Sequence, residues 1–139
     1  MKPMNGSSEE LACVLQTKAI RAVWGGTTWI RSASLEVLAG VTPAVVEGWL
    51  ARRELFALNL DRQAYFPAYA FDSHTRPLPA VAEILRIFAD SSSDMSVAAW
   101  FESTSSSLAG ARPRELLQSD PARVIAAAQQ SVDNDRYAG

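Results

Sequence analysis

The chain has 139 residues, of which 48% are hydrophobic and 20% charged, and its formal net charge is −2. This is the composition of a globular protein with enough apolar residues for a core, and it excludes a protein that holds nucleic acid mainly through a strongly basic surface. Residues 1–76 carry 8 Lys and Arg against 7 Asp and Glu, and residues 77–139 carry 5 against 8. The asymmetry suits a weak DNA contact near the start and a protein partner near the end, although solvated surface also explains it.

The chain has one cysteine, Cys13, and one histidine, His74. A single cysteine cannot form an internal disulfide, and the two residues together cannot supply a zinc site of the usual kind. No apolar run approaches the roughly 20 residues that span a bilayer, and the polar residues 1–10 do not resemble a signal peptide. We therefore expect a cytoplasmic protein with no metal, no cofactor and no membrane contact.

The first predicted element is a helix that begins at the serine pair 7–8 and ends near Val23. Serine followed by two glutamates is typical of a helix start, because the side chains satisfy free amides and the acids suit the positive end of the dipole. The glycine pair at 25–26 ends the helix. The β-branched and aromatic stretch from Thr27 to Arg31 predicts a short strand.

A helix-turn-helix is predicted over residues 34–53. Gly40 can adopt the left-handed conformation that closes the first helix, and Thr42 can cap the second. Pro43 fits the first turn of the second helix, where its missing amide costs nothing. Two helices joined by so short a turn are typical of DNA-binding domains.

A hairpin is predicted next, with strands over residues 55–60 and 64–66 joined by the polar turn of residues 61–63. A hairpin directly after the second helix is a wing. Prolines then break the pattern and place a junction between residues 76 and 77. We expect an N-terminal helix-turn-helix domain with a small β-wing over residues 1–76, packed on a C-terminal helical domain over residues 77–139.

From Pro79 onward the pattern is helical, so the predicted fold class is mainly α. A first helix carries apolar residues at i, i+3, i+4 and i+7, the spacing of a core-facing stripe: Val81, Ile84, Leu85 and Phe88. A loop ending in the capping residue Asp94 precedes a helix over residues 95–102 that buries Val97, Trp100 and Phe101. The last helix is predicted from Pro121 to Ser131.

Spaced landmarks mark the C-terminal half. Trp100 is followed by a Leu-x-Gly-x-x-Pro-x-x-Leu-Leu segment over residues 108–117 and by a Pro-x-x-Val helix start over residues 121–124. This pattern resembles the toxin-binding domain of the Xre/MbcA/ParS antitoxin family. The helix-turn-helix and the aromatic stretch 65–72 also resemble members with an N-terminal domain of DNA-binding type, so the resemblance covers roughly residues 27–130.

The resemblance implies an antitoxin of a type II toxin–antitoxin system. Such antitoxins pack near the active-site cleft of a RES-type toxin, stop it from degrading NAD, and commonly repress their own operon. The NAD chemistry belongs to the toxin, since the glycine pair 25–26 is not part of a dinucleotide-binding turn. The landmark residues are expected to build the scaffold. Toxin contacts are expected among other residues of this half: Arg112, Arg114, Arg123, Gln129, Arg136 and Tyr137. The polar tail from Ser131 either orders on the toxin or is a frayed terminus.

Candidate DNA contacts lie on the second helix and in the wing: Thr42, Ala44, Arg52, Arg53 and Arg62. The arginines are placed where phosphates can be reached, and a solvated helix end is the equal alternative. Glu36 stands where the family has a small residue, and the second helix carries Ala44, Val45, Glu47 and Gly48 in place of side chains that read bases. We expect weak binding by one copy, and hence a homodimer on promoter DNA.

The sequence contains no constellation of nucleophile, base and acid. His74 falls in a predicted loop, and the serine clusters at 91–93 and 103–107 lack the strained turn that exposes a nucleophile. We therefore expect the chain not to be an enzyme. Three functions remain open: a toxin-binding antitoxin, a stand-alone transcription regulator of the winged-helix type, and an orphan protein-binding adaptor. A neighbouring gene for a RES-type toxin would favour the first.

Overall fold

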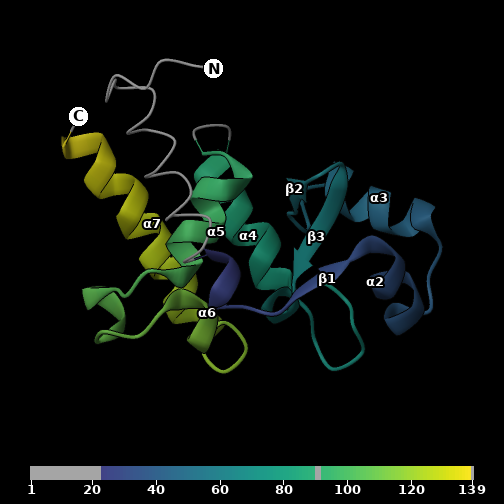
Figure 1. Cartoon of the computed structure of the whole chain (residues 1–139). Helices are drawn as coiled ribbons and strands as arrows, with labels where there is room; N and C mark the ends of the chain where they lie inside the picture. Colours follow the sequence, from purple (N-terminus) through teal and green to yellow (C-terminus); the bar gives the residue numbers. More distant parts are fainter. Residues whose placement is uncertain (1–22, 90–91, 139) are drawn as a thin grey trace, which may run out of the picture.

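The protein is mainly helical and contains one small antiparallel sheet (Figure 1). The computed structural model describes residues 23–89 and 92–138, and it describes side chains as far as residue 134. Most of the helix predicted from the serine pair to Val23, and with it Cys13, lies outside the described residues. The sheet lies between two groups of helices, one from residues 32–51 and the other from residues 79–138.

The N-terminal elements are close to those predicted. Strand β1 (Trp29–Arg31) leads directly into helix α2 (Ser32–Ala39), and three residues connect α2 to α3 (Pro43–Ala51). Gly40 has a φ of 66°, the left-handed conformation expected of a glycine that closes a helix. In the described part of the chain no single helix is long and apolar enough to cross a membrane; α2 and α3 reach that length only as a pair, which is bent by 106°.

The hairpin is tighter than predicted. Strand β2 (Leu58–Leu60) pairs with β3 (Gln63–Pro67), and β1 pairs with the other edge of β3, so the strand order is β1-β3-β2. Only Asp61 and Arg62 form the turn, with φ values of 50° and 65°, as in a type I′ turn. The prediction that residue 63 belongs to the turn is therefore wrong, because Gln63 pairs with Leu60. Residues 55–57, predicted as strand, are buried and precede the ladder.

A loop held by Asp72 connects the sheet to the C-terminal helices. After the short helix η1 (Ala68–Ala70), Asp72 Oδ1 accepts hydrogen bonds from the backbone N–H groups of His74 and Arg76, at 2.8 and 3.0 Å. The bond from Arg76, more than that from His74, lowers the pKa of Asp72. Arg76 Nη1 donates in turn to the Ala39 carbonyl at 3.0 Å and so satisfies the C-terminal end of α2. His74 is exposed in this loop, as predicted.

The C-terminal half is built of helices α4 (Pro79–Phe88), α5 (Asp94–Glu102), α6 (Pro113–Leu116) and α7 (Pro121–Ala138), with a short η3 (Ser106–Leu108). The stripe predicted on α4 is confirmed, since all four of its members are buried.

Two helix ends in this half differ from the prediction. Ser93, and not Asp94, caps α5, because the Ser93 hydroxyl accepts from the Ser96 N–H at 3.1 Å. Helix α7 runs seven residues past the predicted end at Ser131. No glycine or proline stops it there, and Val132 packs against the core, so the polar tail continues the helix. Trp100, predicted to be buried, is only half-buried.

The core is continuous across residues 76 and 77. Phe56, from the segment before β2, stacks on Phe101 of α5 with ring centroids 5.8 Å apart. Tyr69 of η1 packs against the same ring at 5.0 Å. Phe56 and Phe101 are both fully buried, so aromatic packing around Phe101 joins the two halves of the sequence.

We predict that Phe101→Ala lowers the free energy of unfolding by about 3–5 kcal/mol, because it leaves a cavity between the two halves. Val37→Ala, at an exposed position of α2, should change it by no more than about 0.5 kcal/mol. Urea unfolding followed by circular dichroism and by tryptophan fluorescence measures both. If Phe101→Ala does not fold, Phe101→Leu should show a smaller loss. If Phe101→Leu lowers the free energy of unfolding no more than Val37→Ala does, the packing around Phe101 does not hold the two halves together.

Candidate interaction surfaces

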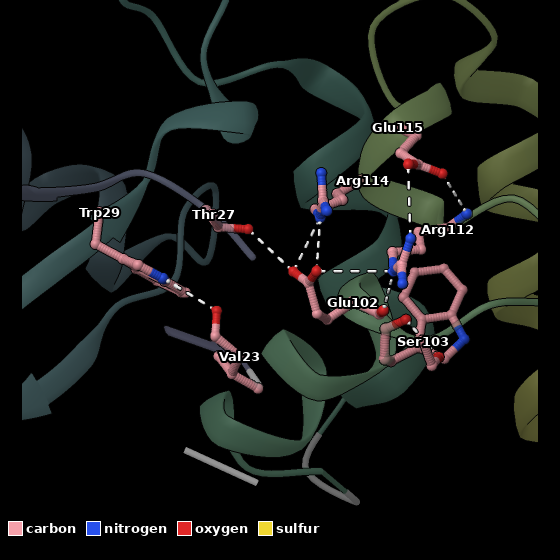
Figure 2. A network of polar contacts seen from close by, with 9 residues as sticks. Val23, Thr27, Trp29, Glu102, Ser103, Arg112, Arg114 and Glu115 are labelled. Atoms are coloured by element: carbon pink, nitrogen blue, oxygen red, sulfur yellow. Dashed lines mark hydrogen bonds and ion pairs between the residues drawn. The ribbon is translucent and has the colours of Figure 1, made fainter. Parts of the chain in front are cut away.

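A half-buried carboxylate, that of Glu102 at the end of α5, gathers three side chains from distant parts of the chain (Figure 2). Arg114 Nε donates to both carboxylate oxygens at 2.9 Å. Arg112 Nε donates to the Glu102 backbone carbonyl at 2.9 Å and lies 3.8 Å from the carboxylate. Thr27 Oγ1 donates to the carboxylate from the other half of the chain, at 3.1 Å. We call these four residues the Glu102 network.

Gly26 lets the chain before β1 approach this carboxylate closely. A Cβ atom added at Gly26 would overlap the carboxylate group of Glu102. Any other residue at this position would therefore push Glu102 away from Thr27 and the arginines. The glycine that was predicted only to end a helix has a second role, which is to make room for an acid 76 residues further along the chain.

Tyr69, whose ring packs against Phe101, lies close to Glu102 and Arg114 of this network. Burial raises the pKa of its hydroxyl, the nearby Glu102 carboxylate raises it further, and Arg114 opposes them. The hydroxyl therefore stays protonated in the folded protein well above the usual range for tyrosine.

Two of the six predicted toxin contacts, Arg112 and Arg114, belong to the Glu102 network. The side chain of Arg114 is only 25% exposed, and that of Glu102 13%. Arg112 is the residue before α6, and its backbone N–H donates to the Glu115 carboxylate at 2.8 Å, which satisfies a free amide at the start of this short helix. Both arginines thus hold α5 against α6, whatever else they contact.

The other toxin candidates lie on α7. Arg123 is exposed and lies 4.0 Å from Asp120, and Gln129 is exposed and donates to Asp133 at 3.2 Å. Both side chains are exposed, whereas Val124 and Ala128 of the same helix are buried. Arg136 and Tyr137 fall in the last turn of α7, and their side chains lie outside the described residues.

The predicted DNA contacts are spread over three places. Thr42 and Ala44 are exposed at the start of α3, and the Thr42 side chain makes no capping hydrogen bond. Arg52 is paired with Glu54 at 2.9 Å, and this hydrogen bond raises the pKa of the guanidinium. Arg53 has a φ of 54° and is paired with Asp94 of α5 at 3.2 Å.

Arg62, the fifth DNA candidate, lies in the β2–β3 turn and is separate from Arg52 and Arg53. It is exposed there. The two neighbouring helices also expose apolar side chains: Val37 is 81% exposed and Leu38 62%, both on α2, and Val45 on α3 is exposed as well. The α2–α3 pair therefore exposes three large apolar side chains.

The described residues contain no group of three or more His, Cys, Asp or Glu side chains that could hold a metal ion. Protein-family models, curated proteins and solved structures give no match to the chain.

Sequence reasoning missed Glu102 as the centre of a network, although it identified both of its arginines. Thr27 lies 75 residues from Glu102, and Arg114 lies 12 residues from it. Neither separation is a helical or strand period, so no local pattern marks the pairing. A carboxylate directly after a buried aromatic pair, at the end of a predicted helix, was the one available signal.

We predict that Glu102→Gln lowers the free energy of unfolding by about 1–3 kcal/mol, because it leaves the part-buried Arg114 without its counter-charge and removes one of the two carboxylates near Arg112. The matched control is Glu115→Gln: this side chain is more exposed, and the amide oxygen can still accept from the Arg112 N–H. The control should cost less than about 1 kcal/mol. Urea unfolding measures both, and equal losses would remove any special role for Glu102.

A second prediction concerns alkaline pH. Because the pKa of Tyr69 is raised above its ordinary value of 10.0, the stability that its neutral hydroxyl contributes is complete below pH 10 and is lost as the pH rises beyond it. Wild type should therefore lose about 1.4 kcal/mol per pH unit above pH 10 relative to Tyr69→Phe, which cannot ionise. Urea midpoints of both proteins at pH 8 and pH 11 test this. A difference between them that does not change with pH would contradict it.

Proposed function

We propose that the chain is the antitoxin of a type II toxin–antitoxin system, which binds and neutralises a RES-type, NAD-degrading toxin and has no catalytic activity of its own. In the bacterial cytoplasm it would repress its operon through the N-terminal half. The observation that carries the proposal is that the sequence landmarks of the antitoxin family occupy positions where the fold depends on their identity.

The landmarks gather in the unit formed by α5, η3, α6 and α7. Trp100 packs edge-on against Phe88, with ring centroids 5.2 Å apart. Gly110 has a φ of 86°, and its N–H donates to the Ser105 carbonyl at 2.8 Å, which closes the loop before α6. Leu116 is partly buried and packs against the core, and three other apolar landmarks are almost fully buried: Leu108, Leu117 and Val124. This agreement supports the resemblance, because unrelated helical segments need not place all of these residues in one unit.

The outer face of α7 is the toxin-binding surface that the geometry favours. Ala122, Ala126 and Gln129 are exposed at spacings of four and three residues, so they share one face of the helix. Small alanines let a partner approach the helix closely, while Gln129 and the neighbouring Arg123 offer polar contacts at the rim. The helix is held from behind by Val124 and Ala128, so this face is rigid before binding.

A DNA-binding role for the other half is supported by the arrangement of α2, α3 and the hairpin. Helices joined by a short turn at 106° are within the range of the helix-turn-helix motif, and the β2–β3 hairpin follows them as a wing would. One such unit offers few polar side chains on α3, so we propose that promoter DNA is bound by a homodimer. The same arrangement fits a stand-alone regulator of the winged-helix type, and toxin neutralisation separates the two.

We predict that the purified chain inhibits NAD consumption by the RES-type toxin of its own operon and consumes no NAD alone. Ala126→Arg should weaken inhibition roughly ten-fold or more, because it places a long charged side chain in the centre of the interface. The control is Ala51→Arg, at an exposed alanine of α3, a helix on the other side of the sheet from α7 (Figure 1), and it should inhibit like wild type. The inhibition constants are measured by titrating each variant into the toxin.

Wild-type chain that leaves the toxin fully active would contradict the antitoxin proposal. Equal inhibition by wild type and Ala126→Arg would retain the antitoxin but move the interface away from the outer face of α7.

A further inference from the structure

Two arginines that no other part of the described chain neutralises line one groove at the sheet end of α2. The groove has a volume of about 420 Å³ and is lined by Arg31, Ser32 and Ala33 on one side and by Arg62, Gln63 and Ala64 on the other. The first three residues are the end of β1 and the start of α2, and the second three are the β2–β3 turn and the start of β3. The antiparallel pairing of Arg31 with Tyr65 fixes the two sides relative to each other.

These arginines differ from the others that the structure describes. Six have a carboxylate partner within 4.0 Å: Arg52, Arg53, Arg86, Arg112, Arg114 and Arg123. Arg76 donates to two backbone carbonyls. Within residues 23–89 and 92–134, Arg31 and Arg62 form no ion pair, although Asp61 directly precedes Arg62.

The rest of the groove also favours an anion. Its lining contributes a hydroxyl from Ser32 and an amide from Gln63, both able to donate, and no carboxylate. The first turn of α2 carries no acidic side chain, and its N-cap residue, Arg31, makes no side-chain capping bond. Two guanidinium groups in such a setting suit phosphate oxygens, which accept from them in pairs.

We propose that this groove, which we call the Arg31–Arg62 groove, binds phosphates of a nucleic-acid backbone and is the main electrostatic contact of the N-terminal half with DNA. The proposal rests on the DNA-binding role proposed above and names the residues that carry it. It favours nucleic acid over an acidic protein because the groove lies between the helix-turn-helix and the hairpin, where successive phosphates of one strand can be reached. It also assigns a smaller role to Arg52 and Arg53, since each already has a carboxylate partner.

The test is binding of the full chain to a fluorescein-labelled duplex of about 20 base pairs, roughly two helical turns, followed by anisotropy at several salt concentrations. Arg31→Gln with Arg62→Gln should weaken binding at least about ten-fold and reduce the slope of log K against log salt by about 1.8, since each phosphate contact contributes about 0.9. Arg52→Gln with Arg53→Gln is the matched control, which removes the same charge and should weaken binding less than about two-fold.

The outcomes separate this inference from the proposed function. If wild type binds the duplex and only the Arg52 and Arg53 variant binds it more weakly, the groove is not the DNA contact, while the DNA-binding role stands. If wild type does not bind the duplex, both the groove and the DNA-binding role fail, while inhibition of the toxin is tested independently. If a polyglutamate peptide binds the wild type as tightly as the duplex does, and the Arg31 and Arg62 variant loses this binding, the groove recognises acidic protein. That result overturns the assignment to nucleic acid.

Discussion

The stacking of Phe101 on Phe56, with the Glu102 network beside it, is the contact on which the arrangement of the whole molecule depends. Phe101 is the last buried residue of α5, and Phe56 and Tyr69 reach it from the segments before and after the hairpin. The neighbouring Glu102 carboxylate adds a polar bond from Thr27 to the same helix. Apolar packing supplies most of the free energy at such a joint, while a part-buried acid with fixed donors admits only one relative orientation of the parts.

This joint separates the two surfaces that we propose for binding. Helix α7 lies on one side of the sheet and the α2–α3 pair on the other (Figure 1), and the Arg31–Arg62 groove lies between the start of α2 and the β2–β3 turn. A toxin on the first surface and DNA on the second would not compete for space. Because one core supports both surfaces, a partner that rigidifies α7 could alter binding at the other surface through that core, which α7 joins mainly by packing on α4.

Features encoded by neighbouring residues were predictable from the sequence. Gly40 and Pro43 locate the turn between α2 and α3, and the apolar stripe of α4 identifies its buried face, because turn chemistry and helical periodicity are local signals. The pairing of Gln63 with Leu60 depends on a two-residue turn formed by Asp61 and Arg62. Both residues have a positive φ in this turn, a conformation that glycine adopts more readily than residues with a side chain. The length of α7 was underestimated because its polar last turns are stabilised by tertiary packing at Val132. The Glu102 network joins residues 75 apart and has no local pattern at all.

Hydrogen–deuterium exchange of the chain, alone and with the proposed RES-type toxin, tests most directly the proposal that the protein is an antitoxin acting through α7. The account predicts slower exchange of the α7 amides in the complex, beyond the protection that the helix already has, and unchanged exchange in α2. Slower exchange confined to α2, where Val37 and Leu38 are exposed, with α7 unchanged, would contradict it.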